Sequence, residues 1–194
     1  MKLKVLSLED VEQARIWRNE CLEALRTSFP LTKEMQSDFY KNIICDRNAK
    51  NRFWGIHEKV KIPYTETIKH YRFDEHKKDT YEAELLIGMT GLENIELENR
   101  RAEISIILDN QYRGLGNGIK AVELLLDKGF NHMNLDNIYG EVYFCNEAVA
   151  FWEKIINIYN ATSTLKRNTK YYAGGYWNSL WFNIERDKYR EAGK

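Results

Sequence analysis

A glycine-rich turn between an apolar strand and an amphipathic helix restricts the fold of this chain more than any other feature. The turn, Gln111–Gly118, reads Gln-Tyr-Arg-Gly-Leu-Gly-Asn-Gly. It follows the mostly apolar segment Glu103–Leu108 and precedes apolar residues at helical spacing in Ile119–Phe130. Glycine lets the backbone turn tightly and approach a ligand closely, and the first amides of a helix lack internal partners. The pattern therefore predicts a strand–turn–helix unit that binds phosphate.

Two common nucleotide-binding turns fit this run poorly. A P-loop ends in Gly-Lys-Ser or Gly-Lys-Thr, whereas Gly118 is followed by Ile119 and Lys120. A dinucleotide fingerprint reads Gly-x-Gly-x-x-Gly, whereas these glycines are spaced Gly-x-Gly-x-Gly and lie late in the chain. A glycine turn without a ligand is the structural alternative. Arg113 and Lys120 would add positive charge to the helix dipole, which favours the phosphate interpretation.

Strands and helices alternate along the chain, and no linker divides it. Apolar and alternating runs predict strands at 1–6, 52–58, 84–90, 103–108, 137–144, 163–172 and 176–184. Helical spacing predicts helices at 7–26, from 32 onward, at 119–130 and at 147–156, the first with a Ser7/Asp10 capping box. Gly174-Gly175 is expected to form the turn of the last hairpin. The alternation predicts a single mixed α/β domain over residues 1–194.

Charge and cysteine content narrow the functional class. The 29 Lys and Arg residues equal the 29 Asp and Glu residues in number, which argues against a protein held on nucleic acid by a basic surface. No apolar run approaches the roughly 18 residues of a membrane helix, so we expect a cytoplasmic protein. Cys21, Cys45 and Cys145 are odd in number and far apart. This favours free thiols over a disulfide framework or a metal site.

A densely charged segment from His57 to Glu84 separates two predicted strands. It holds three of the four histidines, His57, His70 and His76, and their spacing does not suit a metal cluster. Interspersed charges usually mark a solvated surface, so we expect a β-hairpin-like insertion at about 57–84. A lid over a substrate site and a contact within a homodimer are the alternatives.

The glycine-rich run and its neighbours resemble one protein family. Gln111-x-x-Gly114-x-Gly116 is similar to the Gln/Arg-x-x-Gly-x-Gly/Ala pyrophosphate loop of the GCN5-related N-acetyltransferases (the GNAT family), which bind acetyl-coenzyme A. Two segments resemble the paired strands before that loop in the branch of the ribosomal-protein N-terminal acetyltransferases, namely Leu86–Leu92 and Arg101–Ser105. Three more are similar to the strand and helix after it, namely Gly140–Val142, Asn146–Ala148 and Phe151–Lys154. The resemblance covers nearly the whole chain except 57–84.

The resemblance implies the GNAT fold, a central, mixed, mostly antiparallel sheet that splays open beside the loop and is flanked by helices. The pantetheine arm of acetyl-CoA, the acyl donor, would lie against backbone groups of Ile106, Ile107 and Leu108. The other residues implied for the cofactor are Gln111, Arg113, Gly114, Leu115, Gly116, Asn117, Gly118, Ile119, Asn146 and Phe151. Asn146 could also be the N-cap of the helix that follows it. No metal is implied.

The implied chemistry is acetyl transfer to an amine, which must be neutral to attack because an ammonium has no lone pair. Glu103 is the candidate general base, acting through water as a carboxylate on this strand does in family members. Pairing of Glu103 with Arg100 or Arg101 at an exposed strand start is the alternative interpretation.

The general acid of the family has no direct counterpart in this sequence. Many relatives use a tyrosine of the helix after the Asn, but here the aromatic pair is Phe151-Trp152. Tyr172, Tyr176 or solvent would have to protonate the departing sulfur, and Tyr176 is our candidate. The interval from Asn146 to the aromatic pair is one residue shorter than usual, so Cys145 could occupy the Asn position instead.

The acceptor is less determined than the donor. The first two helices line the acceptor site in the family, which brings forward Trp17, Arg18, Asn19 and Phe29. Trp17 also lies on the apolar stripe of the first helix, where core packing explains it. We expect an acetyl-CoA-dependent N-acetyltransferase whose partner is a primary amine of a small molecule, an amino-sugar nucleotide or a protein N-terminus. Transfer of another acyl group and a non-catalytic CoA-binding module are the alternatives.

Overall fold

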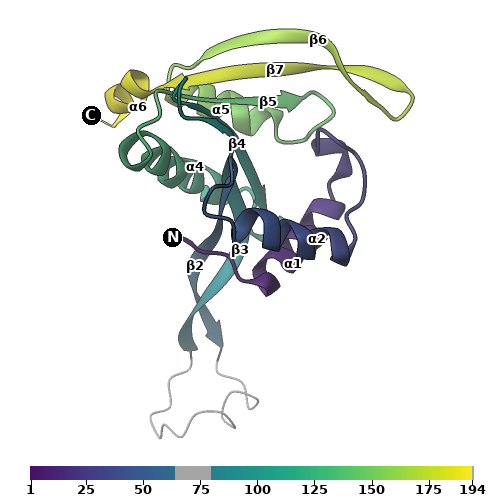
Figure 1. Cartoon of the computed structure of the whole chain (residues 1–194), viewed down its shortest axis with the longest axis vertical. Coiled ribbons are helices and arrows are strands. Elements are labelled where there is room, and N and C mark those ends of the chain that lie inside the picture. Colours follow the sequence, from purple (N-terminus) through teal and green to yellow (C-terminus); the bar gives the residue numbers. More distant parts are fainter. Residues whose placement is uncertain (64–79, 194) are drawn as a thin grey trace, which may run out of the picture.

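The computed structural model describes residues 1–63 and 80–193, and its centre is a seven-stranded sheet (Figure 1). The strand order is β1-β2-β3-β4-β5-β7-β6. The strands are β1 Lys2–Lys4, β2 Arg52–Pro63, β3 Thr80–Glu96, β4 Arg101–Leu108, β5 Asn137–Tyr143, β6 Thr162–Tyr172 and β7 Gly175–Glu185. Neighbouring strands are antiparallel except β4 and β5, which run parallel. The prediction of a mixed, mostly antiparallel sheet is confirmed.

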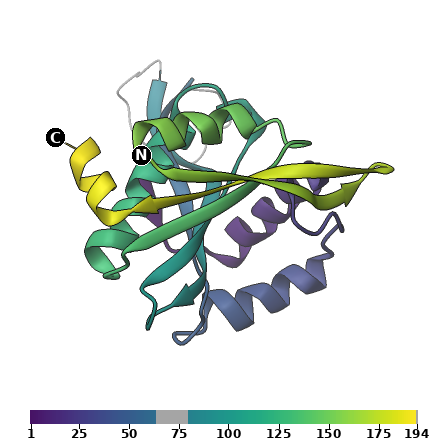
Figure 2. The same ribbon diagram turned by 90° about the horizontal axis from the view of Figure 1, so that it is seen from above.

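Helices cover both faces of this sheet. They are α1 Leu8–Asn19, η1 Leu22–Ala24, α2 Lys33–Phe39 with its π-helical continuation η2 Tyr40–Ile44, η3 Asn110–Tyr112, α4 Asn117–Asp127 continued by η4 Lys128–His132, α5 Val149–Ile158 and α6 Arg186–Ala192. Figure 2 shows α5 on one side of the sheet and α1 and α2 on the other. None of the described helices is long and apolar enough to cross a membrane.

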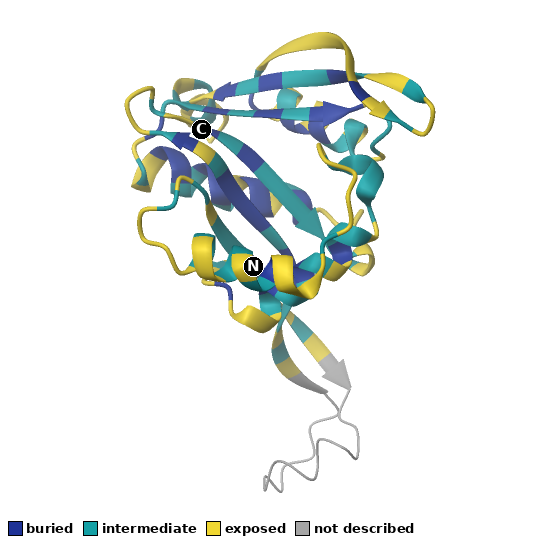
Figure 3. Ribbon diagram, turned by 45° about the vertical axis from the view of Figure 1, so that its right-hand side comes forward, coloured by how far each residue is buried: buried dark blue, intermediate teal, exposed yellow. Residues whose placement is uncertain are grey.

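The main core lies between the sheet and helices α4 and α5. Alternation along the strands places Leu92 of β3, Ile104 of β4 and Ile138 of β5 on this side. Their partners from the two helices are Val122, Leu125, Leu126, Trp152 and Ile155. Figure 3 shows buried residues along the middle strands and exposed ones along β6 at the edge. The intervening residues, Glu93 and Glu103 among them, therefore lie on the opposite face, the one that carries α1.

The parallel strands β4 and β5 pair over only three positions. Arg101–Glu103 aligns with Asn137–Tyr139, but β4 continues to Leu108 and β5 to Tyr143. Beyond Glu103 the described structure therefore has no strand hydrogen-bonded to the β5-facing edge of β4. The sheet therefore splays open as predicted, and β4 ends directly before the glycine-rich turn.

The start of the first predicted helix is confirmed and its end is wrong. Ser7 Oγ accepts a hydrogen bond from the Asp10 amide (3.1 Å), and the Asp10 carboxylate accepts one from the Ser7 amide (2.9 Å). The helix ends at Asn19 instead of near Arg26. The Asn19 side chain bonds both the amide and the carbonyl of Leu31 (2.9 Å each), which folds the segment after α1 back on itself.

The strand ends and the last turn also differ from the predictions. β3 runs on to Glu96 rather than ending at Thr90, and the short helix α6 was not predicted. Because Tyr172 pairs with Gly175, the hairpin turn consists of Ala173 and Gly174, with φ of 51° and 86°. Two residues with positive φ match the twist of a two-residue hairpin, so Gly174-Gly175 was the wrong pair.

The described part of the predicted insertion continues the two strands on either side of it. β2 and β3 stay antiparallel from the Arg52–Leu92 pair out to the Pro63–Thr80 pair. His57 belongs to β2. His70 and His76 lie outside the described residues.

Gly140 allows β5 to approach the main core closely. A Cβ added there would lie 2.5 Å from Phe182 Cζ and 2.9 Å from Ile104 Cγ2. We expect Gly140→Val to lower the free energy of unfolding by about 2 to 3 kcal/mol through overpacking, measured by urea denaturation. Gly175→Val is the control, because an added Cβ there meets no described atom within 4 Å. Equal stabilities of the two variants would contradict this packing.

Candidate functional site

The glycine-rich turn has two left-handed glycines at the start of α4. Gly114 and Gly116 have φ of 73° and 81°, a region that residues with a Cβ rarely enter. Gly116 is the N-cap of α4, and the Lys120 amide donates the first helical hydrogen bond to the Gly116 carbonyl (3.3 Å). The amides of Asn117–Ile119 precede that bond, so they are available to an anion, and the helix dipole favours one there.

Hydrogen bonds from side chains of the turn itself hold it in this shape. Asn117 Nδ2 donates to the Tyr112 carbonyl (3.1 Å) and thereby closes the turn on itself. Arg113 Nε donates to the Leu108 carbonyl (3.0 Å), which keeps the guanidinium beside the end of β4. A preformed cradle binds its ligand at a smaller ordering cost.

The outer side of the turn is open. A Cβ at Gly114 or Gly116 would meet no described atom within 4 Å. Leu115 between them is 68% exposed. Gln111 is exposed as well, with its amide bonded to the Asp109 carboxylate (2.9 Å). Gly114, Leu115 and Gly116 thus border open space, whereas Asn117 and Gly118 are buried at the start of α4.

Residues of β4 and α5 border the turn. Ile106–Leu108 occupy the stretch of β4 that has separated from β5. A Cβ added at Gly118 would lie 2.8 Å from Phe151 Cε2, so the glycine lets α5 pack on the first turn of α4. Asn146 Oδ1 accepts from the Ala148 amide (2.8 Å) just before α5, but Ala148 is the N-cap of α5 and no side chain caps it, so the N-cap role considered for Asn146 is wrong. The end of β4 and the starts of α4 and α5 therefore meet at the turn.

Three glutamates lie on the sheet face opposite the main core. Glu93 pairs with Glu103 across β3 and β4, and Glu103 aligns with Tyr139 of β5. Glu141 follows two residues later on the same face. The Tyr139 ring stacks on Trp181 with 6.2 Å between centroids. Carboxylates and aromatic rings thus gather where β4 leaves β5.

Arg26 binds Glu103, and sequence reasoning missed this contact. Arg26 Nη2 donates to Oε1 of Glu103, and Nη1 donates to Oε2 (3.3 Å). Asn94 Nδ2 also donates to Oε2 (3.1 Å). Arg26 precedes Glu103 by 77 residues, so no local pattern could have paired them.

The two arginines considered as partners of Glu103 pair elsewhere. Arg100 Nη1 lies 2.7 Å from Asp136 Oδ2, and Arg101 Nη2 lies 2.9 Å from Glu96 Oε1. The alternative that placed Arg100 or Arg101 on Glu103 is therefore wrong. Glu103 does form an ion pair, but its partner is Arg26 from the segment after η1.

A buried lysine anchors the segment after α1. Lys170 of β6 is 6% exposed, and its Nζ donates to the carbonyls of Glu23 (2.5 Å) and Leu25 (2.6 Å). The ring centroids of Tyr143 and Tyr172 each lie 5.0 Å from Nζ. Burial lowers the pKa of Lys170 below its ordinary value. This lysine joins the edge hairpin to the segment that places Arg26 on Glu103.

The predicted acceptor residues are divided between core, loop and surface. Trp17 is 5% exposed, so it is buried as its place on the apolar stripe indicated. Asn19 holds Leu31, as described above. Arg18 lies close enough to Glu93 for its charge to act on that carboxylate. Phe29 is 59% exposed. Of these four residues, only Arg18 lies near the carboxylate face, the sheet face that carries Glu93, Glu103 and Glu141.

Neither candidate for the general acid is brought to Glu103. Tyr176 lies at the tip of the β6–β7 hairpin, 68% exposed, with its ring against Tyr171. Tyr172 ends β6 beside the same hairpin turn, and its ring centroid lies 5.0 Å from Lys170 Nζ. Among the described residues, no hydrogen bond joins either side chain to the three glutamates.

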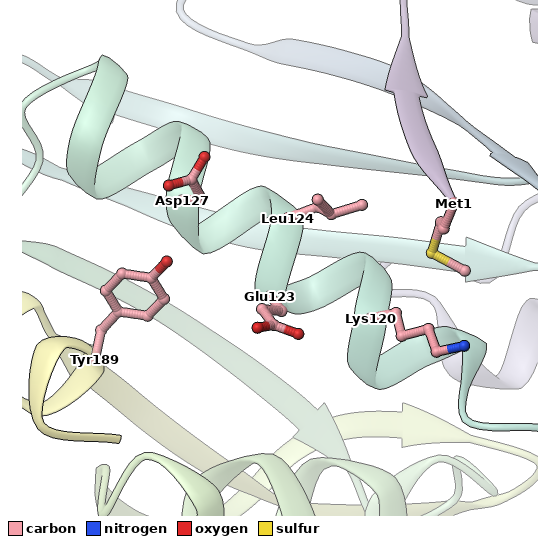
Figure 4. Close-up of a pocket in the computed structure, with 6 residues that line it drawn as sticks. All are labelled: Met1, Lys120, Glu123, Leu124, Asp127 and Tyr189. Atoms are coloured by element: carbon pink, nitrogen blue, oxygen red, sulfur yellow. The ribbon is translucent and has the colours of Figure 1, made fainter. Parts of the chain in front are cut away.

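A separate pocket of about 470 Å³ lies along α4 (Figure 4), the helix that packs on the sheet face opposite to Glu103. Its lining residues are Met1, Lys120, Glu123, Leu124, Asp127 and Tyr189. Two carboxylates make it unsuitable for a phosphate, since like charges repel. In the described ranges, no three His, Cys, Asp or Glu side chains are grouped as a metal site.

Comparisons with known proteins agree with this arrangement. Residues 1–151 match the acetyltransferase (GNAT) domain. The uncharacterized N-acetyltransferase p20 of Bacillus licheniformis is 39% identical over 71 residues, which is 37% of this chain and 38% of that protein. The spermidine N(1)-acetyltransferase of Escherichia coli K12 is 33% identical over 74 residues, 34% of this chain and 40% of that protein. The chain thus matches about two fifths of the length of these relatives.

A solved structure with the same fold extends the comparison to nearly the full length. It is the spermidine N-acetyltransferase from Vibrio cholerae in complex with CoA and spermine. It superimposes with a TM-score of 0.71, covers 97% of both chains, and is 18% identical. At this level of sequence identity, the similarity between the two structures is evidence for a shared fold alone.

Proposed function

The chain belongs to the GNAT acetyltransferase family, and on that premise we propose that it transfers an acetyl group from acetyl-CoA to a primary amine of a small cationic molecule. The observation that carries the proposal is the separation of β4 from β5 beyond Glu103, directly before the glycine-rich turn. An open strand edge can pair with an extended, amide-bearing arm. The adjacent helix start suits the pyrophosphate of the same molecule.

The donor would lie along β4 with its pyrophosphate over the start of α4. Backbone groups of residues 106–108 would bond the pantetheine arm, and the amides of residues 117–119 would bond phosphate oxygens. Arg113, held beside the end of β4, would add a full positive charge. The acetyl group would then lie where β4 leaves β5, beside the glutamates.

The acceptor we propose is a di- or polyamine. Glu93, Glu103 and Glu141 give this face negative charge, which Arg26 on Glu103 and Lys166 on Glu141 (3.7 Å) offset in part. One of the three must also remove a proton, since amine pKa values near 8 to 10 leave the nitrogen charged at neutral pH. The names of the E. coli and V. cholerae proteins support the same acceptor class. The resemblance of residues 86–92 to the ribosomal-protein branch makes a protein N-terminus the competing acceptor, together with an amino-sugar nucleotide.

Thiol release from acetyl-CoA across a panel of amines tests the proposal. We expect spermidine or another polyamine to give a kcat/KM at least about tenfold above that of an N-terminal peptide or an amino-sugar nucleotide, because recognition of the second ammonium adds transition-state binding. A preference for the peptide would move the chain to the protein N-terminal acetyltransferases. CoA binding without thiol release would instead identify a non-catalytic CoA-binding module.

A further inference from the structure

This inference rests on the proposed acetyl transfer and concerns its first step. We propose that Glu93 of β3, rather than Glu103 of β4, takes the proton from the acceptor ammonium. The two glutamates are directly opposed across the paired strands, so both lie within reach of the same acceptor nitrogen. Their surroundings differ, and this difference distinguishes their roles.

Both carboxylate oxygens of Glu103 already accept hydrogen bonds. Arg26 donates to Oε1 and to Oε2 (3.3 Å), and Asn94 donates to Oε2 (3.1 Å). The Glu103 side chain is 13% exposed, so little water competes for these bonds. A proton on Glu103 would have to displace one of these donors. Bidentate hydrogen bonds between a guanidinium and a carboxylate are among the stronger hydrogen bonds in proteins. Glu103 is therefore better suited to hold Arg26 in place.

Glu93 has the surroundings of a proton acceptor. Its burial raises the pKa of the carboxyl above the ordinary 4.5, and the negative charge of Glu103 acts in the same direction. A hydrogen bond with Ser105 and the charges of Arg18 and Arg26 lower the pKa, but by less. These are the groups that face Glu93 from β4, from α1 and from the segment after η1. A carboxylate with a raised pKa removes protons more effectively near neutral pH.

The proton balance of the step is complete with this assignment. Glu93 takes one proton from R–NH3⁺, and the lone pair of the resulting R–NH2 attacks the carbonyl carbon of the thioester. A carbon–nitrogen bond forms and the carbon–sulfur bond breaks. The sulfur leaves with a second proton from the nitrogen as the CoA thiol, and Glu93 returns its proton to solvent. The net products are an amide, a thiol and one proton.

Matched glutamine variants of the two glutamates test the assignment. We expect Glu93→Gln to lower kcat about 100-fold or more, the usual contribution of a general base, with an unchanged Kd for acetyl-CoA in calorimetry. With saturating spermidine, wild-type kcat should fall as the pH drops through the raised pKa of Glu93. Glu93→Gln should lose this acid limb, Glu103→Gln should keep it, and Glu93→Asp should keep it at a reduced rate.

Two outcomes would overturn the assignment in different ways. An acid limb that Glu93→Gln keeps and Glu103→Gln loses would return the role to Glu103 and leave the proposed function intact. Wild-type protein that binds acetyl-CoA but releases no thiol with any amine would overturn the proposed function and this assignment together.

Thermal unfolding separates a role in proton transfer from a role in the fold. Because the fold disfavours ionised Glu93, its contribution makes the free energy of unfolding decrease as the pH rises from the unfolded-state value of 4.5 through the higher folded-state pKa. Glu93→Gln should therefore leave Tm at pH 8 unchanged or raise it, although kcat falls. A Tm and a kcat that fall together would show a structural role and overturn the proposal.

Discussion

Gly116→Trp is expected to abolish acetyl-CoA binding while the protein stays folded. No described atom lies within 4 Å of a Cβ at this position, so the indole would extend over the open side of the turn rather than into the core. It would cover the amides of Asn117–Ile119, which we assign to the pyrophosphate. We expect the Kd for acetyl-CoA, measured by calorimetry, to rise at least about 100-fold, equivalent to about 2.8 kcal/mol.

The chain offers a matched control in Gly174→Trp. Gly174 has φ of 86°, close to the 81° of Gly116, and a Cβ there also meets no described atom within 4 Å. The two variants thus share the backbone strain of a left-handed residue, about 1 to 2 kcal/mol, and an exposed indole. Gly174→Trp lies in the β6–β7 hairpin turn and should bind acetyl-CoA like the wild type. Equal affinities of the two variants would contradict the assignment of the turn to phosphate.

The shape of the glycine-rich turn was predictable because most of its determinants are local. Gly114 and Gly116 are required by backbone angles within one turn, whereas Gly118 is required by the close approach of Phe151 from α5, a tertiary contact. The spacing of apolar residues on either side of the turn indicates that a strand precedes the turn and a helix follows it. The splay of the sheet followed from a family resemblance, since no pattern within β4 shows that its pairing with β5 stops at Glu103.

The carboxylate face was only partly predictable because it depends on strand pairing and on loop placement. Glu103 was identified from its strand, but Glu93 was outside the predicted strand, which ended at Thr90. Once β3 is known to run to Glu96, register places Glu93 opposite Glu103. Arg26 reaches Glu103 only because Asn19 ends α1 early and turns the following segment back. Such contacts follow from tertiary structure rather than from residue spacing.

The burial of Lys170, on the edge strand β6, was likewise not predictable from residue spacing. Lys166, Arg167 and Lys170 of β6 read as an exposed, charged run, and two of the three are exposed. Lys170 is buried because the carbonyls of Glu23 and Leu25 bond its ammonium from 147 and 145 residues away. A buried ammonium needs such partners, since desolvation without them costs several kcal/mol.

Lys170→Met is expected to weaken amine binding while leaving acetyl-CoA binding intact. Methionine is a flexible, apolar side chain that can pack in the site of the lysine stem, but it removes the ammonium from the carbonyls of Glu23 and Leu25, which leaves Glu23 only the weak bond from the Cys145 thiol (3.4 Å). Hydrogen bonds to a charged group contribute about 1.5 to 3 kcal/mol each, and both losses fall on the segment that places Arg26 on Glu103. We therefore expect kcat/KM for the amine to fall about 100-fold, mainly through KM. Stopped-time assays with spermidine and calorimetry with acetyl-CoA measure the two effects.

The control variants decide whether this effect is local. Arg167→Met removes an exposed charge from the same strand and should leave KM unchanged, whereas Lys170→Gln keeps one donor and should fall between the wild type and Lys170→Met. Hydrogen exchange of Glu23–Arg26 should accelerate in Lys170→Met, while α4 stays protected. Faster exchange throughout the sheet would make the kinetic loss a folding defect. Unchanged amine kinetics despite faster exchange of Glu23–Arg26 would show that the acceptor does not use this segment, and it would leave Glu141 and the Tyr139–Trp181 stack as its binding surface.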